Sequence, residues 1–175
     1  MARAALDLVE PGMTVMVNDG SMAALLGANL TDKTPLTVIT NNAAVIERLK
    51  DAPRVTLIAL GGTYSAKFNG FFGVVTEDAL SRLRADLAFI STPAVAGLRA
   101  FHMDDAAVRA KRAMISAADR AVLLVNHTRF GRSALHTLAD LTDFDAIITD
   151  AAPAPEDRAA IDRAGIALTI AKDPA

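Results

Sequence analysis

The chain contains no cysteine, and that absence removes several kinds of chemistry. Without thiols there is no disulfide framework, no thiolate nucleophile and no thiolate-bound metal. A protein that uses no disulfides fits a reducing compartment, so we expect a cytoplasmic location. The sequence also has no Walker loop and no GxGxxG fingerprint, so a nucleotide cofactor is not expected.

Long apolar runs and an excess of one charge are lacking as well. The longest apolar runs, such as Leu57–Leu60 and Ala121–Val125, are far too short to cross a bilayer, so no membrane partner is expected. The 18 basic and 20 acidic residues give a net charge of −2. Because non-specific nucleic-acid binding depends on clustered Lys and Arg, we expect that this chain itself does not bind DNA.

The composition of the chain is typical of a single globular domain of ordinary size. Hydrophobic residues make up 52% of the 175 positions, enough for a buried core and too many for a disordered chain. Short β-branched runs alternate with Ala-rich amphipathic segments, which is typical of βαβ units. The short runs are mostly apolar along their length rather than alternating, as in strands buried on both faces. We predict a single α/β domain, residues 1–175, with a Rossmann-like parallel sheet between layers of helices.

The pattern predicts seven strands and five helices. The predicted strands are Thr14–Asn18, Leu36–Thr40, Val55–Leu60, Asp86–Ser91, Ala121–Val125, Ala146–Thr149 and Ala167–Ile170. The predicted helices are Met22–Leu30, Ala43–Lys50, Glu77–Arg84, Asp105–Ala118 and Pro155–Ala164. The stretch from Gly61 to Gly73 breaks this rhythm with four glycines, and it is either an active loop over the sheet edge or a crossover. Residues 172–175 are expected to form a frayed end.

The loops that follow the strands are the expected ligand site, because parallel sheets bind ligands beyond their carboxyl ends. The first loop is Asn18-Asp19-Gly20-Ser21, in which Gly20 permits a tight turn and Ser21 offers a hydroxyl and a helix cap. A plain turn with a capping serine is the alternative interpretation. Further small or polar loops follow the next strands: Thr40-Asn41-Asn42, Gly61-Gly62-Thr63, Ser91-Thr92-Pro93 and Asn126-His127-Thr128-Arg129. Together they favour a small anionic ligand that carries hydroxyl groups.

Other candidate residues remain open at this level. The basic cluster Arg109, Lys111 and Arg112 lies on a predicted helix and is either a solvated face or an anion site. None of the three histidines has metal-ligand spacing with carboxylates on a helix face, so no metal site is expected. Of the three, His127 lies at a strand end and is the one worth testing. Asp150, also at a strand end, is expected to cap the following helix.

The ordered set of motifs resembles the effector-sensing domain of DeoR-family transcriptional regulators, over about Ala4 to Asp150. The motifs are Asn18-Asp19-Gly20-Ser21, Thr40-Asn41-Asn42, Leu60-Gly61-Gly62, Asp86-Leu87-Ala88-Phe89, Lys111-Arg112-Ala113-Met114-Ile115 and Arg129-Phe130-Gly131. The resemblance implies a fold similar to ribose-5-phosphate isomerase, glucosamine-6-phosphate deaminase and CoA transferases. It implies a phosphorylated sugar or related metabolite as effector, no enzymatic activity, and a homo-oligomer. DNA would be bound only by a winged helix-turn-helix that is absent here, so we expect an isolated effector domain.

The resemblance also assigns the effector-binding residues by position. They are Asp19, Gly20 and Ser21 in the first loop, Thr40, Asn41 and Asn42 in the second, Gly61 and Gly62 in the third, then Lys111 and Arg129. Lys111 matches a lysine near the family's pocket. Arg129 stands where a lysine is usual, which keeps the charge but changes the geometry. Asn126-His127-Thr128 replaces the usual Asp-Ser-Ser and so removes a carboxylate.

An enzyme of the same fold is the alternative function. A sugar-phosphate isomerase or deaminase needs a carboxylate base beside the reacting carbons and a cation that stabilises the enediolate. Asp19 is the one acid in the first three loops, and Asp104 or Asp105 with Lys111 is the other candidate set.

Overall fold

The computed structural model describes residues 1–171, and its centre is a seven-stranded sheet in which every neighbouring pair is parallel. The strands are β1 (Thr14–Val17), β2 (Leu36–Thr40), β3 (Val55–Ala59), β6 (Ala85–Ser91), β9 (Ala118–Leu124), β11 (Ala146–Thr149) and β12 (Ala167–Ile170). All seven predicted strands are present, so the predicted Rossmann-like sheet is confirmed. The expected frayed end, residues 172–175, lies outside the described residues.

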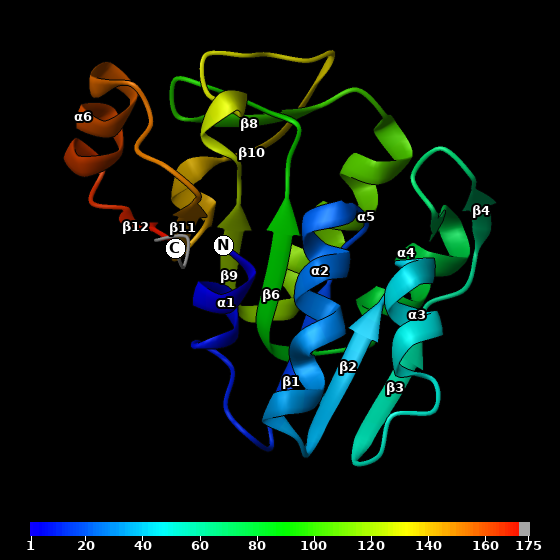
Figure 1. Cartoon of the computed structure of the whole chain (residues 1–175). Helices are drawn as coiled ribbons and strands as arrows, with labels where there is room; N and C mark the ends of the chain where they lie inside the picture. The colour runs from blue at the N-terminus through cyan, green and yellow to red at the C-terminus, as the bar shows by residue number, and fades with distance from the viewer. Residues whose placement is uncertain (172–175) are drawn as a thin grey trace.

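Helices cover both faces of this sheet (Figure 1). The helices are α1 (Ala2–Leu6), α2 (Ser21–Asn29), α3 (Ala43–Leu49), α4 (Val74–Ser81), α5 (Asp105–Ala117) and α6 (Pro155–Arg163). Successive strand residues point to opposite faces. Val15 and Val17 of β1 therefore share a core cluster with Leu26 of α2, whereas Met16 shares the other cluster with Met114 of α5. Both faces of the central strands are buried, which explains why these strands are mostly apolar rather than alternating.

The order of the strands reverses next to β1. The sheet runs β12-β11-β9-β6-β1-β2-β3, so the chain first moves outward from β1 through β2 to β3. It then returns to the other side of β1 as β6 and moves outward in the opposite direction. Val17 is consequently in register with Thr40 on one side and with Phe89 on the other. In open parallel sheets such a reversal leaves a crevice beyond the strand ends, where ligands bind.

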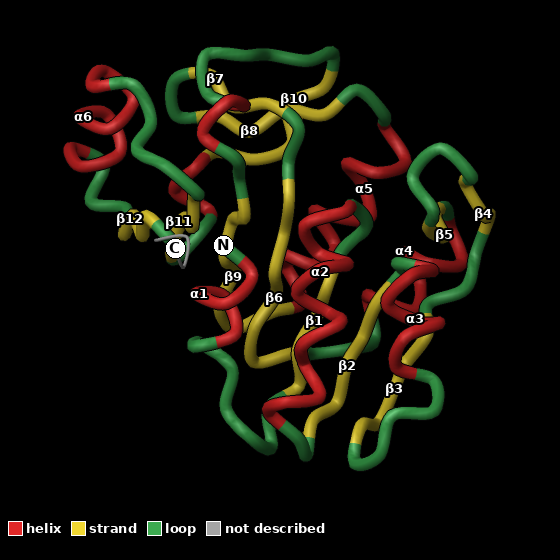
Figure 2. Tube along the Cα trace, in the orientation of Figure 1, coloured by secondary structure: helices red, strands yellow, loops and turns green. Residues whose placement is uncertain are grey.

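Two small antiparallel sheets and three short 3₁₀ helices complete the described chain. β4 (Thr63–Ser65) and β5 (Gly70–Phe72) form a hairpin, and β7 (Ala94–Ala96), β8 (Arg99–His102) and β10 (His136–Asp140) form a three-stranded sheet. The 3₁₀ helices are η1 (Leu30–Lys33), η2 (His127–Arg129) and η3 (Leu141–Asp143). Figure 2 shows the three-stranded sheet above the carboxyl end of β6. The Gly61–Gly73 segment, expected to be an active loop or a crossover, consists mainly of the β4–β5 hairpin.

The start of α4 differs from the prediction for a local reason. α4 begins at Val74 rather than Glu77, because Gly73 supplies the left-handed backbone (φ 95°) at the helix start. Val74 and Val75 are 82% and 63% exposed, so the first turn shows no amphipathic pattern. Within the described residues no helix is both long and apolar enough to span a membrane.

Candidate ligand-binding site

The ends of β1 and β6 are joined by Asn18, which is fully buried. Its Oδ1 accepts the backbone N–H of Ser91 at 3.1 Å, and its Nδ2 donates to the Ser91 hydroxyl at 3.3 Å. The same hydroxyl donates to the carbonyl oxygen of Asp19 at 3.1 Å. These bonds fix the first predicted loop at the point where the strand order reverses.

Lys111 reaches this loop from α5. Its side chain is 2% exposed, and its Nζ donates to the carbonyl of Ser91 at 3.0 Å. The same nitrogen lies 3.5 Å from Oδ2 of Asp19, whose side chain is 3% exposed. Burial lowers the pKa of Lys111, while the Asp19 and Asp104 carboxylates act in the opposite direction. The site therefore contains a buried pair of opposite charges at the strand ends.

Helix α2 begins in the first loop without a side-chain cap. Gly20 is the residue before the helix, with φ 112°, and Ser21 is the first helical residue. The interpretation of Ser21 as a cap is therefore wrong, and the N–H groups of the first turn have no side-chain acceptor. A Cβ at Gly20 would lie 2.8 Å from the Ser91 hydroxyl oxygen, so glycine is also required for the close approach of the two loops.

These elements surround a cavity of about 640 Å³. Five of the predicted site residues line it: Asp19, Gly20, Ser21, Lys111 and Arg129. Arg129 is exposed in η2 and forms no ion pair within the described residues. Two cations and one carboxylate thus face the cavity, which suits an anionic ligand. Residues 1–171 contain no cluster of three or more His, Asp or Glu arranged to hold a metal ion.

The second predicted loop lies behind the cavity rather than on it. Thr40, Asn41 and Asn42 are buried, and none of them lines the cavity. The Thr40 hydroxyl donates to the carbonyl of Val17 at 2.6 Å and accepts the N–H of Asn42 at 3.0 Å. Asn41 donates through Nδ2 to the carbonyl of Phe71, so it holds the β4–β5 hairpin against the sheet. These polar groups mainly satisfy one another and the backbone.

Asn42 connects the second loop to the first. Its Oδ1 caps α3 by accepting the N–H of Ala44 at 3.0 Å. Its Nδ2 donates to the carbonyls of Asn18 and Gly20, both at 3.2 Å. One side chain therefore fixes the start of α3 and the position of the loop that carries Gly20.

Gly61 and Gly62 also lie away from the cavity, at the base of the hairpin. The Thr76 hydroxyl of α4 donates to the carbonyl of Gly61 at 2.6 Å. At Gly62, where φ is 132°, a Cβ would lie 2.5 Å from the carbonyl oxygen of Phe72. The absent side chain of Gly62 therefore allows its backbone to pack closely against Phe72 of β5 and Thr76 of α4, and it does not leave room for a ligand at this position.

His102 lines the cavity, although it was not among the residues predicted for the site. It is the last residue of β8, it is 3% exposed, and its Nδ1 accepts the N–H of Asp104 at 3.1 Å. Burial and the nearby Lys111 lower its pKa from 6.5 to about 4. The sequence signal that could have indicated His102 was weak. This histidine comes two residues before the capping Asp104, and its strand is too short to show a periodic pattern.

The loop that carries Arg129 is held by Asp150. This carboxylate accepts the Asn126 side-chain amide at 2.5 Å and the His127 backbone N–H at 2.7 Å, and it lies 3.1 Å from His127 Nδ1. Burial acts to raise the pKa of Asp150, but the bonds from His127 outweigh it and lower the pKa. The expectation that Asp150 caps the next helix is wrong, because Ala154 precedes α6. Asp150 instead fixes the turn at the cavity rim.

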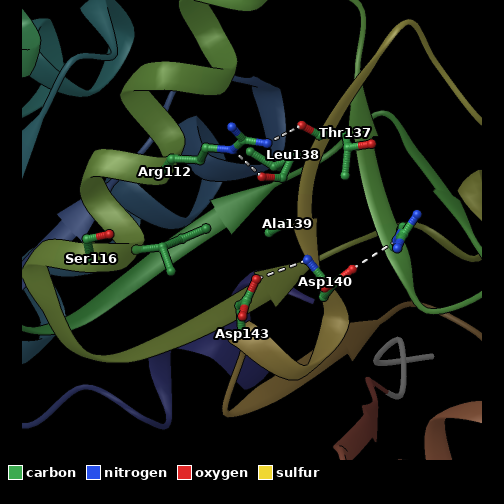
Figure 3. A pocket seen from close by; sticks show the side chains of 9 residues that line it. Arg112, Ser116, Thr137, Leu138, Ala139, Asp140 and Asp143 are labelled. Carbon is green, nitrogen blue, oxygen red and sulfur yellow. Dashed lines mark hydrogen bonds and ion pairs between the residues drawn. The ribbon is translucent and has the colours of Figure 1, made fainter.

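The predicted basic cluster separates into three environments. Arg109 is exposed and pairs with Glu77 at 3.0 Å and with Asp105. Lys111 is buried at the cavity, as described above. Arg112 faces a second depression of about 590 Å³ beside β10 (Figure 3). Its guanidinium donates to the carbonyls of Thr137 and Leu138, both at 2.7 Å, so it secures the edge of β10. This second depression contains none of the predicted site residues.

Comparison with known families decides the identity of the chain. Residues 1–151 match the DeoR C terminal sensor domain. The chain belongs to the DeoR family. This DeoR-family chain is 31% identical over 151 residues to the L-fucose operon activator of Haemophilus influenzae, covering 86% of this chain and 60% of that protein. It is 27% identical over 157 residues to the glycerol-3-phosphate regulon repressor of Escherichia coli, covering 87% and 61%. It therefore spans about three-fifths of the length of these relatives.

Solved structures agree with the predicted fold of this DeoR-family domain. Ribose 5-phosphate isomerase A from Neisseria gonorrhoeae superposes with a TM-score of 0.51 at 14% identity, covering 77% of this chain and 52% of the isomerase. At this identity the likeness concerns the fold alone. The resemblance in fold to ribose-5-phosphate isomerase is confirmed.

Proposed function

We propose that this DeoR-family domain binds a phosphorylated sugar or a related phosphorylated metabolite beyond the carboxyl ends of β1 and β6. The observation that carries the proposal is the buried Lys111–Asp19 pair beside the uncapped start of α2. A phosphate needs N–H donors and positive charge, which the first turn of α2 and Lys111 supply. The hydroxyl groups of a sugar need acceptors, and the Asp19 carboxylate is one.

Some of the predicted residues would contact the ligand, and the others would hold the binding loops in place. Gly20 and Ser21 contribute backbone N–H groups, and Arg129 reaches over the cavity from the exposed rim. The second loop, Thr40-Asn41-Asn42, acts indirectly by holding the first loop from behind. Gly61 and Gly62 are still further from the ligand, because their backbone packs against the β4–β5 hairpin and α4.

Regulation of DNA binding is the role that the relatives' names support, since they describe an operon activator and a regulon repressor. We propose that ligand binding alters DNA binding by a part of the protein outside this chain, and that the chain self-associates. Such coupling requires that the ligand favour one of two arrangements of the assembly. Sedimentation velocity with and without ligand measures both the assembly and its response. A monomer in both conditions contradicts the assembly proposal.

Thermal melting tests the ligand class. The probes are glycerol 3-phosphate, fructose 6-phosphate and fuculose 1-phosphate, each compared with its unphosphorylated parent. At least one ester is expected to raise the melting temperature while its parent does not, since a ligand at 100 times its Kd adds about 2.7 kcal/mol to stability. A rise with the neutral parents alone contradicts the proposal.

Two exposed arginines provide a matched control. Arg129→Gln is expected to weaken binding of the ester, whereas Arg132→Gln, three residues further on and outside the cavity, is expected to leave it unchanged. Both side chains are exposed, so neither change should prevent folding. Equal effects of the two changes would show that general positive charge, rather than the cavity, attracts the ester.

The isomerase alternative requires a carboxylate that is free to move a proton. Asp104 accepts the N–H of Ala107 and caps α5, and Asp105 pairs with Arg109. Asp19 is the one carboxylate among the described residues that line the cavity, and Lys111 lies beside it. These engagements support ligand binding without turnover. A coupled isomerase assay with ribose 5-phosphate tests this; turnover that Asp19→Asn or Asp104→Asn abolishes would favour the enzyme.

A further inference from the structure

The His102 ring is oriented by the protein on the wall of the cavity. Its Nδ1 accepts the N–H of Asp104 at 3.1 Å, and the Phe68 ring lies 5.5 Å away, centroid to centroid, at an angle of 53°. Asp104 is itself fixed, because its Oδ1 accepts the N–H of Ala107 at 3.0 Å at the start of α5. The direction of the imidazole is therefore set before any ligand arrives.

The bond to Asp104 decides which ring nitrogen carries the proton. A nitrogen that accepts a backbone N–H has no hydrogen of its own, so the neutral imidazole of His102 is protonated at Nε2. This Nε2–H has no hydrogen-bond acceptor within residues 1–171, although the side chain lines the cavity. Burial and Lys111 lower the pKa of His102 to about 4, which keeps the ring neutral near pH 7. The cavity thus has a neutral donor near the charged donor of Lys111.

We propose that His102 is a specificity-determining residue that donates its Nε2–H to an uncharged oxygen, a hydroxyl or carbonyl, of the phosphorylated ligand. This inference rests on the proposed function and names the part of the ligand beyond the phosphate. Lys111 and the start of α2 provide for the charged group, whereas a neutral donor suits a neutral oxygen. The Nε2 atom is open to the cavity, so a ligand that fills the cavity but lacks that oxygen would cover the N–H and leave it unpaired, which is how a polar site rejects an analogue that lacks a hydroxyl.

Two substitutions separate the donor from the rest of the ring. His102→Asn keeps an oxygen that can accept the Asp104 N–H but has no donor at the Nε2 position. His102→Gln places an amide N–H close to where Nε2–H lies. Calorimetric titrations use inorganic phosphate and the three esters glycerol 3-phosphate, fructose 6-phosphate and fuculose 1-phosphate. We expect the Asn variant to bind the recognised ester about 3- to 10-fold more weakly, with phosphate unchanged, and the Gln variant to recover most of the loss.

The outcomes distinguish this inference from the proposed function. An Asn variant that binds the ester as tightly as the natural chain overturns the role of His102 and leaves the proposed function standing. Equal losses for phosphate and ester also overturn it, because His102 would then only maintain the fold. If the natural chain binds none of the esters, both proposals fail together.

A measurement on the free protein gives an independent check that needs neither ligand nor variant. Nitrogen-15 NMR of the imidazole reports which ring nitrogen is protonated, and we expect protonated Nε2 and bare Nδ1 at pH 7. Protonation of Nδ1 would leave Nε2 of His102 without a hydrogen to donate into the cavity, and it would overturn the inference.

Discussion

The ammonium nitrogen of Lys111 lies 3.5 Å from Oδ2 of Asp19, and the two side chains are 2% and 3% exposed. A buried pair of this kind loses hydration that its mutual attraction must offset. Lys111 also donates a hydrogen bond to the carbonyl of Ser91, so α5 is linked both to the end of β6 and to the loop after β1. One lysine therefore links three elements at the place where the strand order reverses, and the stability of the loop and its proposed chemistry depend on the same contact.

Removing both partners of this pair is expected to cost less than the sum of the two single removals. Lys111→Met leaves the Asp19 carboxylate buried without its cation, and we expect it to lower the free energy of unfolding by about 3 to 5 kcal/mol. The double variant Asp19→Asn with Lys111→Met should lose about 1 to 3 kcal/mol less than the sum of the two single changes. Urea denaturation of the natural chain, Asp19→Asn, Lys111→Met and the double variant measures this coupling. A coupling within about 0.5 kcal/mol of zero would show that the two charges do not stabilise each other.

The close approach at Gly20 can be isolated from its backbone strain. Gly20 and Gly12 both have positive φ, 112° and 94°, but a Cβ at Gly12 has nothing within 4 Å, whereas one at Gly20 meets the Ser91 hydroxyl. Gly20→Ala should therefore destabilise the fold by about 1 kcal/mol more than Gly12→Ala. In the Ser91→Ala protein, which lacks this hydroxyl, Gly20→Ala should cost less than it does in the natural chain. Chemical denaturation decides the matter, and equal losses at the two glycines would exclude the contact as the cause.

The fold was largely predictable because its central strands are buried on both faces. Mostly apolar stretches such as Leu36–Thr40 and Ala146–Thr149 carry a signal that needs no long-range information. The small strands gave no such signal. Thr63–Ser65 has three residues, two of them exposed, so neither length nor period separates it from a loop. Its pairing with Gly70–Phe72 depends on a turn between them rather than on either segment alone.

The candidate site was predictable where it follows directly from a strand end. Asp19 and Gly20 come immediately after a buried strand, so the topology places them at the crevice. A polar residue at a strand end can equally serve its neighbours, and Asn42 does so by bonding backbone groups of two loops. His102 lies on an antiparallel strand outside the main sheet, and only the tertiary arrangement brings it beside Lys111.

Asn42 should position the first loop without touching the ligand. Asn42→Ser keeps an oxygen that can cap α3 but is too short to donate to the carbonyls of Asn18 and Gly20, and Asn42→Ala removes both functions. We expect losses of about 1 kcal/mol for Ser and about 2 kcal/mol for Ala in the free energy of unfolding. Both variants should weaken binding of a phosphate ester, since both release Gly20. Ester binding that survives in Asn42→Ser would show that the capping bond alone matters.

The stability of the chain should depend on pH through His102. Its pKa is about 4 in the folded protein, against 6.5 for an unperturbed histidine, because of burial and Lys111, with the carboxylates of Asp19 and Asp104 acting in the opposite direction. Between these two pH values the unfolded chain binds a proton that the folded chain does not. The free energy of unfolding should therefore fall by about 2 to 3 kcal/mol as the pH drops through this interval, with the full loss reached below the folded pKa.

Urea denaturation at half-unit pH steps from pH 7 to pH 4 measures this slope, and His102→Gln should flatten it. His136→Gln is the control, because His136 is the cross-strand neighbour of His102 on β10 and does not line the cavity. Asp150 does not confuse the comparison, because the loss of stability that its lowered pKa causes falls mostly below its ordinary pKa of 3.8 and is shared by all three proteins. If the slope of His102→Gln equals that of the natural chain, the imidazole of His102 is not held neutral by its surroundings, and the acid sensitivity arises elsewhere.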